Sequence, residues 1–233
     1  MIKRIATVGG WTLVSRVSGF IRDVVMAAVL GAGPLADAFF VAFRLPNHFR
    51  AIFAEGAFAA AFVPAYARTL QQAGIDAAKL FADRIAAALI VINLVLLALA
   101  LLFTPWVVSI LAPGLDPMRF DLAVALTRIT FPYLALVSME TLFAGILNAN
   151  QRFAAAAGAP VLLNVSLIAT LLLAPYLQSA GYAAAWGVAI AGVAQVILVA
   201  VDAEMRGVGI RFRMPKLDPT TRRRCASGWH AVR

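Results

Sequence analysis

Cysteine is almost absent from this sequence, with Cys225 the single example in 233 residues. One cysteine excludes an internal disulfide framework and any cysteine-rich metal site. The two histidines, His48 and His230, lie far apart and lack the spacing of metal ligands. The motifs of serine hydrolases, zinc proteases and phosphate-binding loops are also missing from the sequence. We therefore expect no metal, no cofactor and no enzymatic activity.

Charged residues are scarce as well, at 13% of the chain, against roughly a quarter in soluble domains. Hydrophobic residues make up 63% of the chain. Apolar runs of about 20 residues, the length that spans a bilayer, recur along it. This composition excludes an ordinary soluble domain. It predicts an all-α fold, a polytopic bundle of transmembrane helices.

The net charge of +9, from 20 basic and 11 acidic residues, would suit a nucleic-acid ligand. The basic residues, however, gather in short loops and at the C-terminus, which is the pattern that the positive-inside rule produces. We therefore expect membrane lipids, and no nucleic acid, beside these charges.

The apolar runs predict about six transmembrane helices, which form one lobe over residues 1–206. We place these helices at residues 9–30, 36–66, 85–111, 120–148, 160–177 and 182–205. A polar connector at 68–84 separates the second helix from the third. Pro46 is predicted to kink the second helix, because proline removes an intrahelical hydrogen bond. In a membrane the freed carbonyl needs a neighbour or water, which points to a cavity beside Pro46 and Asn47.

Lysine and arginine fall almost entirely on one side of these helices. If the N-terminus is cytoplasmic, the opposite side holds Arg119 alone. The cytoplasmic loops then hold Lys3, Arg4, Arg68, Lys79, Arg84, Arg152 and every basic residue from Arg206 onward. The positive-inside rule therefore predicts that both termini are cytoplasmic. Residues 207–233 read as a basic tail attracted to anionic lipid headgroups.

Several full charges interrupt the first predicted helix at membrane depth. A charged side chain there costs a few kcal/mol or more, and normally faces a bundle interior or a wet cavity. At 100° per residue, Arg16, Gly19 and Asp23 fall within about 60° of one another, and Arg22 widens this side to about 120°. Gly19 leaves a gap between the charges where a ligand or another backbone can approach.

The second predicted helix also carries charged residues at membrane depth. Asp37 and Arg44 are seven residues apart and so share one face, whereas Arg50 and Glu55 follow Pro46. We interpret the two helices as the wall of a cationic pocket for an anionic substrate. Its proposed ligands are the guanidinium groups of Arg16, Arg22 and Arg50, each able to fork onto phosphate oxygens. Its proposed orienting or gating acids are Asp23, Asp37 and Glu55.

The alternative is that these charges form interhelical salt bridges that only fix packing, although ion pairs inside a membrane are costly as pure stabilisers. Arg128 and Glu140, in the fourth predicted helix, are weaker candidates for a site, and Arg128 can snorkel if it lies near a membrane face. Asn93, Ser138 and Asn164 are interpreted as hydrogen-bonding groups between helices rather than as ligands.

The charged stretches resemble the MurJ (MviN) family of lipid II flippases. The resemblance is carried by Ser-Arg-x-x-Gly-Phe-x-Arg-Asp from Ser15 to Asp23, Asp-Ala-Phe-Phe-Val-Ala-Phe-Arg-Leu-Pro-Asn from Asp37 to Asn47, Arg50, the run from Phe53 to Pro64, Gly145 to Asn148, Arg152-Phe153, Pro160 and Asn164. It covers roughly residues 5–219. The motif in the first two helices is specific to that family.

The resemblance implies a place in the multidrug/oligosaccharidyl-lipid/polysaccharide exporter superfamily, whose members have two lobes of transmembrane helices. It implies transport of lipid II, the undecaprenyl-pyrophosphate-linked peptidoglycan precursor, across the bacterial inner membrane by alternating access. By the same resemblance, Arg16, Arg22, Asp37 and Arg50 correspond to the family's cavity charges, with Glu55 as a companion. The arginines would meet the pyrophosphate.

The sequence contains the helices of one lobe only. The resemblance therefore indicates the N-terminal half of a flippase, with the second lobe missing and the reading frame truncated or shifted after about Pro219. Alternating access needs two lobes that move against each other, so we expect this chain to be inactive alone. Two other interpretations stay open. One is another polysaccharide-lipid or drug exporter of the superfamily, which the motif from Ser15 to Asp23 disfavours, and the other is a non-transporting membrane fragment.

Overall fold

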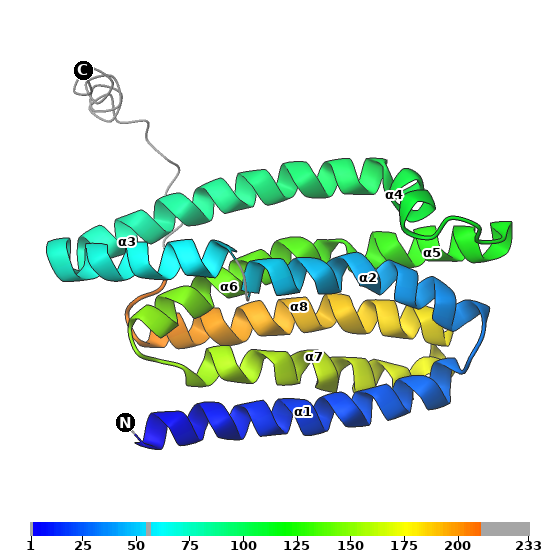
Figure 1. Ribbon diagram of the computed structural model, residues 1–233, viewed down its shortest axis with the longest axis horizontal. Coiled ribbons are helices and arrows are strands. Elements are labelled where there is room, and N and C mark those ends of the chain that lie inside the picture. Colours follow the sequence, from blue (N-terminus) through cyan, green and yellow to red (C-terminus); the bar gives the residue numbers. More distant parts are fainter. Residues whose placement is uncertain (1, 55–56, 211–233) are drawn as a thin grey trace, which may run out of the picture.

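The structure, a computed structural model, describes residues 2–54 and 57–210 (Figure 1). Within these ranges every regular element is helical. The helices are α1 (Ile2–Leu30), α2 (Pro34–Ala54), α3 (Ala57–Leu102), α4 (Thr104–Leu111), α5 (Pro117–Thr130), α6 (Pro132–Ala149), α7 (Ala154–Leu172), the short 3-10 helix η1 (Ala174–Tyr176) and α8 (Ala180–Met205). The predicted class, an all-α membrane bundle, is confirmed.

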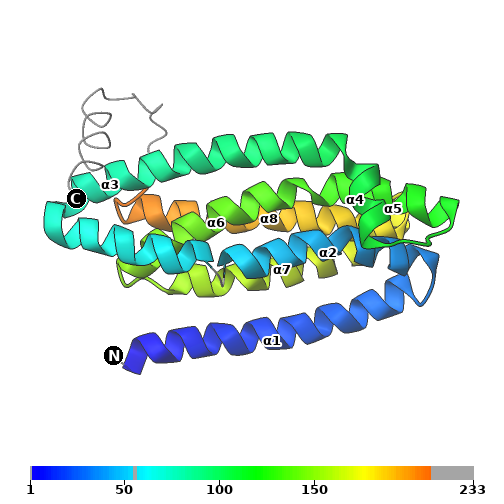
Figure 2. The same cartoon turned by 45° about the horizontal axis from the view of Figure 1, so that its top comes forward.

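The long helices run side by side along the length of the molecule (Figures 1 and 2). Helix α7 packs between α1 and α8, and α6 packs between α3 and α8. The start of α1, the bend within α3 and the end of α8 lie at one end of the bundle. The turn between α1 and α2 and the turn between α4 and α5 lie at the other end (Figure 1). Helices α1 and α8 therefore run along most of the bundle, as membrane-spanning helices do, whereas α2 is continued by the first part of α3 and α5 by α6.

The predicted number of about six spans is not confirmed. In the described part of the chain, four helical stretches are long and apolar enough to cross a membrane: 58–102, 117–149, 154–172 and 180–205. Helices α1 and α2 are not among them. These two helices carry the charged motifs, and charged side chains lower the apolar character of a helix. The helices that depart from ordinary spans are thus the ones on which we placed the pocket.

Residues 68–84 are not a separate connector, because α3 continues through them except at Gly74. Gly74 has φ 81° and ψ −179°, a conformation that essentially only glycine adopts. There the chain reverses direction, so that α3 has a first arm, residues 57–73, and a second arm, residues 75–102 (Figure 1). The connector is rich in Ala, Leu, Gln, Lys and Arg, which are good helix formers. Polarity alone was therefore a poor guide to the end of the helix.

Three other predicted boundaries also move. The third predicted span is divided at Phe103, between α3 and α4, and the fourth at Phe131, between α5 and α6. In both cases a proline, Pro105 or Pro132, occupies one of the first two positions of the new helix, where the missing N–H has no partner to lose. The fifth predicted span begins earlier, at Ala154, and its last residues form η1.

Pro46 does not end the second helix, since α2 continues through it to Ala54. The proline ring removes the N–H that would have bonded to the carbonyl of Ala42. The hydroxyl of Thr130, in α5, donates to this carbonyl at 2.9 Å. A neighbouring helix therefore satisfies the group that the proline frees, which is one of the ways a membrane helix tolerates proline.

We expect Thr130→Val to lower the free energy of unfolding by about 1–3 kcal/mol, because it leaves the buried carbonyl of Ala42 without a donor. Pro46→Ala restores an N–H to that carbonyl, so the same valine substitution should cost much less in the Pro46→Ala background. The measurement is a double-mutant cycle of unfolding in mixed detergent micelles. Thr69→Val is the matched control, because the Thr69 hydroxyl bonds within its own helix to Ala65. Equal costs of Thr130→Val in both backgrounds would refute the interpretation.

The buried apolar side chains form two clusters. One joins α1, α2, α5, α7 and α8 near the end of the bundle that holds the turn between α1 and α2. The other joins both arms of α3 to α6, α7 and the second half of α8. Along α6, Val137 belongs to the first cluster and Leu142 to the second. The polar pocket described next is lined by the part of α6 where the clusters meet.

Candidate functional site

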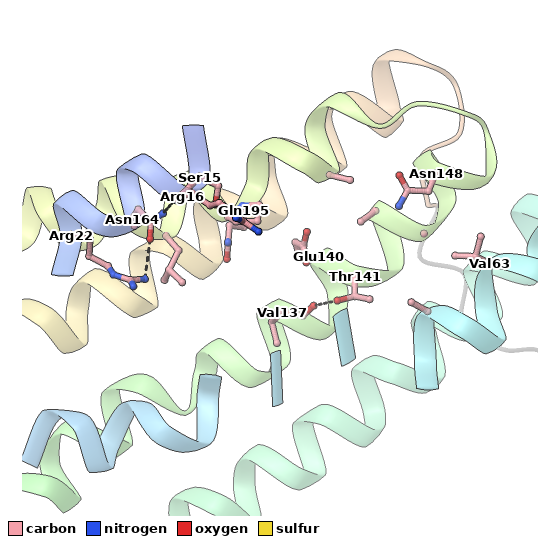
Figure 3. A pocket seen from close by; sticks show the side chains of 17 residues that line it. Ser15, Arg16, Arg22, Val63, Val137, Glu140, Thr141, Asn148, Asn164 and Gln195 are labelled. Atoms are coloured by element: carbon pink, nitrogen blue, oxygen red, sulfur yellow. Dashed lines mark hydrogen bonds between the residues drawn. The ribbon is translucent and has the colours of Figure 1, made fainter. Parts of the chain in front are cut away.

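A cavity of about 430 Å³ opens between α1, the first arm of α3, α6, α7 and α8 (Figure 3). We call it the central pocket. Its apolar lining comes mostly from small side chains of α6 and α7. Its polar lining residues are Ser15, Arg16, Arg22, Glu140, Thr141, Asn148, Asn164 and Gln195. Helices that are otherwise apolar therefore bring eight polar side chains to one cavity.

Asn164, in α7, is the residue that ties α1 to the pocket. Its Nδ2 donates to the carbonyl of Ser15 at 3.1 Å and to the hydroxyl of Ser18 at 2.9 Å. A Cβ at Gly19 would lie 3.6 Å from this Nδ2, in ordinary contact. Gly19 therefore lies against the amide of Asn164, which is the group that approaches α1 at this position.

Arg22 is held from two sides. Its Nη1 donates to Asn164 Oδ1 at 2.9 Å, as Figure 3 shows, while its Nε and Nη2 both donate to Asp23 Oδ1, at 3.0 and 2.7 Å. The side chain of Arg22 is 22% exposed and that of Asp23 is 60% exposed. Solvent screens the carboxylate more than the guanidinium, so Asp23 is a partner that an incoming anion can replace.

Arg16 lines the same pocket but is exposed. Six residues separate it from Arg22, which is about 9 Å along the helix axis. The two guanidinium groups therefore belong to one cavity at different depths. An anion with more than one phosphate group can contact both.

Helices α6 and α8 supply the opposite wall. Glu140 lines the pocket and is only 8% exposed. Gln195 is held by two hydrogen bonds, accepting from the hydroxyl of Tyr133 at 3.2 Å and donating to the carbonyl of Ala159 at 2.9 Å. Pro160 follows directly, and it removes the N–H that the carbonyl of Ala156 would accept. A buried acid of α6 and a fixed amide of α8 thus line the same cavity as the two arginines of α1.

The structure brings together only some of the residues that the sequence predicted for the pocket. Arg16 and Arg22 line it, and Asp23 lies at its edge, paired with Arg22. Asp37 is elsewhere. Its carboxylate accepts from Arg119 Nη1 at 3.0 Å. The side chain of Arg50 and the whole of Glu55 lie outside the described residues.

The pair of Asp37 and Arg119 joins the first turn of α2 to the first turn of α5. Arg119 also contacts Asp116, the residue that caps α5, at 2.8 Å. All three side chains are at least one-third exposed. Asp37 thus lies at the end of the bundle away from the start of α1, where it links two helix ends.

A second cavity, of about 360 Å³, adjoins α2 on the side of Phe40, Arg44, Asn47 and His48. Every residue that lines it belongs to α2, and Pro46 is not among them, so the cavity predicted beside Pro46 and Asn47 stays a prediction. The second cavity shares no lining residue with the central pocket. Arg44 consequently belongs to a different surface from Arg16 and Arg22.

Three pocket residues were underrated or missed in the sequence. Glu140 is only a weak candidate in the sequence, and Asn164 is interpreted there as a hydrogen-bonding group between helices, a role that it also fills. Gln195 was not singled out. The signal they share is a lone polar residue inside an apolar run. Asn93 and Ser138 share it too, yet they bond to each other at 3.3 Å and are absent from the pocket lining, as predicted.

The fold and the pocket define a polytopic helical membrane protein with a cationic polar cavity between its helices. Comparison with known families shows to which family of membrane proteins the chain belongs. A family model described as "Lipid II flippase MurJ" matches residues 26–227. Since this is most of the chain, the chain belongs to the MurJ family. The match extends beyond Pro219, where we had expected the resemblance to end.

Individual relatives agree with the family match. A protein of Rhizobium meliloti named probable lipid II flippase MurJ is 46% identical over 230 residues, covering 96% of this chain and 43% of the relative. Lipid II flippase MurJ of Burkholderia cenocepacia is 43% identical over 201 residues, covering 85% of this chain and 39% of the relative. The chain thus spans less than half the length of these relatives.

A solved structure has the same fold. It is titled "Lipid II flippase MurJ, inward closed conformation", and it matches with a TM-score of 0.76 at 24% identity. The match covers 89% of this chain and 43% of the solved one. The arrangement of helices described above is therefore that of one part of a larger transporter structure.

Proposed function

We propose that this chain forms the N-terminal lobe of a transporter that moves lipid II across a membrane by alternating access. One observation carries the proposal: two arginines, Arg16 and Arg22, share an open pocket inside the membrane bundle of a MurJ family member. A charged side chain at bilayer depth is costly in free energy, so its presence usually marks an ion pathway, a charged partner or a substrate site. The pyrophosphate of a lipid-linked sugar is a substrate of matching charge.

Each pocket residue has a role in this proposal. Arg22 and Arg16 bind the pyrophosphate, with Arg50 as the third arginine. Asn164 holds Arg22 in position when the site is empty, and Asp23 gives way to the substrate. Glu140 balances the positive charge from the opposite wall. Asp37 and Glu55 act in gating, Asp37 through its link to Arg119.

The size of the pocket suits part of the substrate. Small-molecule sites usually enclose about 300–1,000 Å³, and the central pocket is near the lower limit, at about 430 Å³. This volume admits a pyrophosphate and the adjoining sugar, while a complete lipid-linked headgroup needs more wall than one lobe provides. In transporters of this kind the substrate site lies at the interface of two repeats or lobes. The uncovered part of the longer relatives would supply the second wall.

The proposed location is the inner membrane of a bacterium, with both termini in the cytoplasm. Reporter fusions placed at the bend near Gly74 or after Arg206 should then report the cytoplasm. Fusions near Pro34 or Asp116 should report the opposite side, because they lie at the other end of the bundle. A signal from the opposite side at Gly74 would overturn this topology, since the positive-inside rule places Arg68, Lys79 and Arg84 in the cytoplasm.

The proposed function is tested with a full-length chimera, in which residues 1–210 replace the corresponding part of the Burkholderia cenocepacia relative. The chimera should support growth of bacteria that are depleted of their own lipid II flippase. A chimera that inserts into the membrane at normal levels and fails to support growth would count against the proposal. Depleted cells that carry the empty vector serve as the negative control.

A further inference from the structure

A small cavity of about 180 Å³ opens at the end of the bundle where α1 begins and α8 ends. The turn between α6 and α7 lies at the same end (Figures 1 and 2). We call it the terminal cavity. Its lining residues are Thr7, Gln151, Arg152, Phe153, Ala154 and Arg206, so both of its charged residues are arginines. It shares no lining residue with the central pocket.

Arg152 is fixed in place by the hydrogen bonds that end α6. Its backbone N–H donates to the carbonyl of Leu147 at 2.8 Å, and the N–H of Gln151 donates to the carbonyl of Asn148 at 2.9 Å. This pair of bonds is a Schellman motif, with Gln151 in its left-handed position at φ 60°. The backbone of Arg152 is therefore held in a hydrogen-bonded turn.

Arg206 is positioned by the same device at the end of α8. The N–H of Val208 donates to the carbonyl of Ala203 at 2.9 Å, and Gly207 takes the left-handed position at φ 68°. The side chain is also oriented, because its Nε donates to Asp202 Oδ1 at 2.9 Å. Asp202 engages the Nε edge, which leaves the two Nη groups as the donors that a ligand would meet.

The two arginines come from positions 54 residues apart in the sequence, yet they line one cavity. Neither Asp202, which forms an ion pair with Arg206 at 2.9 Å, nor Glu204 lines the cavity. Of the two arginines, Arg152 is the one whose charge no ion pair offsets within the described part of the chain. Guanidinium groups that converge in this way bind phosphate well, because each can fork onto two oxygens. The terminal cavity is therefore built for an anion.

The position of the cavity decides which anion it meets. It lies at the end of the long apolar helices, at the membrane surface that carries most of the basic loops and is cytoplasmic in the proposed topology. Trp11 lies one turn further into the membrane on the same face of α1 as Thr7. Trp11 is 38% exposed, and its ring would lie 3.5 Å from a Cβ at Gly158 of α7. An apolar surface thus continues from the cavity towards the bilayer interior.

We propose that the terminal cavity binds an anionic phospholipid of the cytoplasmic leaflet. Arg152 and Arg206 contact its phosphate, and one acyl chain lies along α1 beside Trp11. Basic pockets between transmembrane helices on the cytoplasmic side are typical sites for such headgroups. A free phosphate would meet the same arginines but gain nothing from the apolar surface. The choice of the cytoplasmic leaflet rests on the proposed topology, whereas binding at this site does not depend on transport.

The test uses the full chain with Trp11 as its single tryptophan, the other three being replaced by phenylalanine, in phosphatidylcholine nanodiscs. Brominated phosphatidylglycerol, which quenches nearby tryptophan, is titrated against brominated phosphatidylcholine. We expect saturable quenching of Trp11 with a clear preference for phosphatidylglycerol. Arg152→Ala and Arg206→Ala should each reduce this preference by about fivefold, as expected for one basic residue near an anionic surface. Arg152→Ala is the decisive variant, because the turn uses the backbone of Arg152 and not its side chain.

Arg68→Ala is the matched control, since Arg68 is an exposed arginine near the same end of the bundle and outside the cavity. Its effect should stay within about twofold. Equal losses from Arg68→Ala and Arg152→Ala would show diffuse surface charge and refute the site. No preference for phosphatidylglycerol would refute it as well. Competition by millimolar inorganic phosphate would show that the cavity takes free phosphate, which overturns the assignment to a lipid.

Discussion

Arg22→Ala in the full-length chimera is expected to abolish growth while leaving membrane insertion unchanged. The Arg22 guanidinium is already oriented towards the pocket by Asn164 and Asp23. A hydrogen bond to a charged group contributes about 1.5–3 kcal/mol, so its loss weakens substrate binding by about 10- to 150-fold. The readout is growth of flippase-depleted cells, with the amount of inserted protein measured by immunoblotting of membranes.

Two further variants test whether the effect is specific to the guanidinium group of Arg22. Arg22→Lys should restore growth poorly, because an ammonium group cannot fork onto two phosphate oxygens as a guanidinium does. Arg128→Ala should grow normally, because Arg128 is an exposed arginine of α5 that does not line the pocket. Normal growth of Arg22→Ala at normal protein level would show that Arg22 serves packing only.

The second large effect is expected when the 233-residue chain is expressed without any partner. It should fail to support growth of flippase-depleted cells, whereas the chimera succeeds. The pocket arginines lie on one wall, and a site at a lobe interface needs the other wall as well. Co-expression with the remaining part of the Burkholderia relative as a separate chain should recover part of the activity.

Two measurements complete this experiment. Membrane fractionation shows whether the chain is inserted when expressed alone, and crosslinking shows whether it associates with itself. Robust growth from the chain alone would contradict the expectation and would mean that two copies form a working pair of lobes. If neither the chimera nor the chain alone supported growth, the result would contradict the proposal that this lobe takes part in transport.

The fold class, and the shared cavity of Arg16 and Arg22, could be predicted from the sequence because both depend on local pattern. Long apolar runs leave helices as the stable choice in lipid. On α1 the spacing of Arg16, Gly19 and Arg22 places them towards one side, whatever packs against the helix. The common side of Arg16 and Arg22 therefore follows from α1 alone, although four other helices complete the cavity that they line.

The contacts that could not be predicted depend on which helices become neighbours. The spacing of Asp37 and Arg44 gave no sign that Asp37 pairs with Arg119, which is 82 residues away. Pro46 indicated that a neighbour or water must satisfy the freed carbonyl, but nothing local showed that the hydroxyl of Thr130, from another helix, supplies the donor. Such partners follow from tertiary packing and have no local signature.

The ends of the helices were difficult to predict from polarity alone. Residues 68–84 are polar, yet both arms of α3 continue through them, and a single glycine at position 74 makes the turn. Near the bilayer surface a helix can leave the apolar region without ending, because water and headgroups accept its polar side chains. Polarity therefore marks the edge of the membrane better than it marks the end of a helix.

The central claim is that the pocket of Arg16 and Arg22 contacts lipid II during transport. The direct measurement is translocation of fluorescent lipid II in proteoliposomes that contain the purified chimera, followed by quenching of the label that remains in the outer leaflet. We predict rapid translocation by the chimera, and a rate at the level of empty liposomes for the Arg16→Ala/Arg22→Ala double variant, with Arg128→Ala unchanged. Translocation by the double variant at the rate of the unaltered chimera would contradict the account.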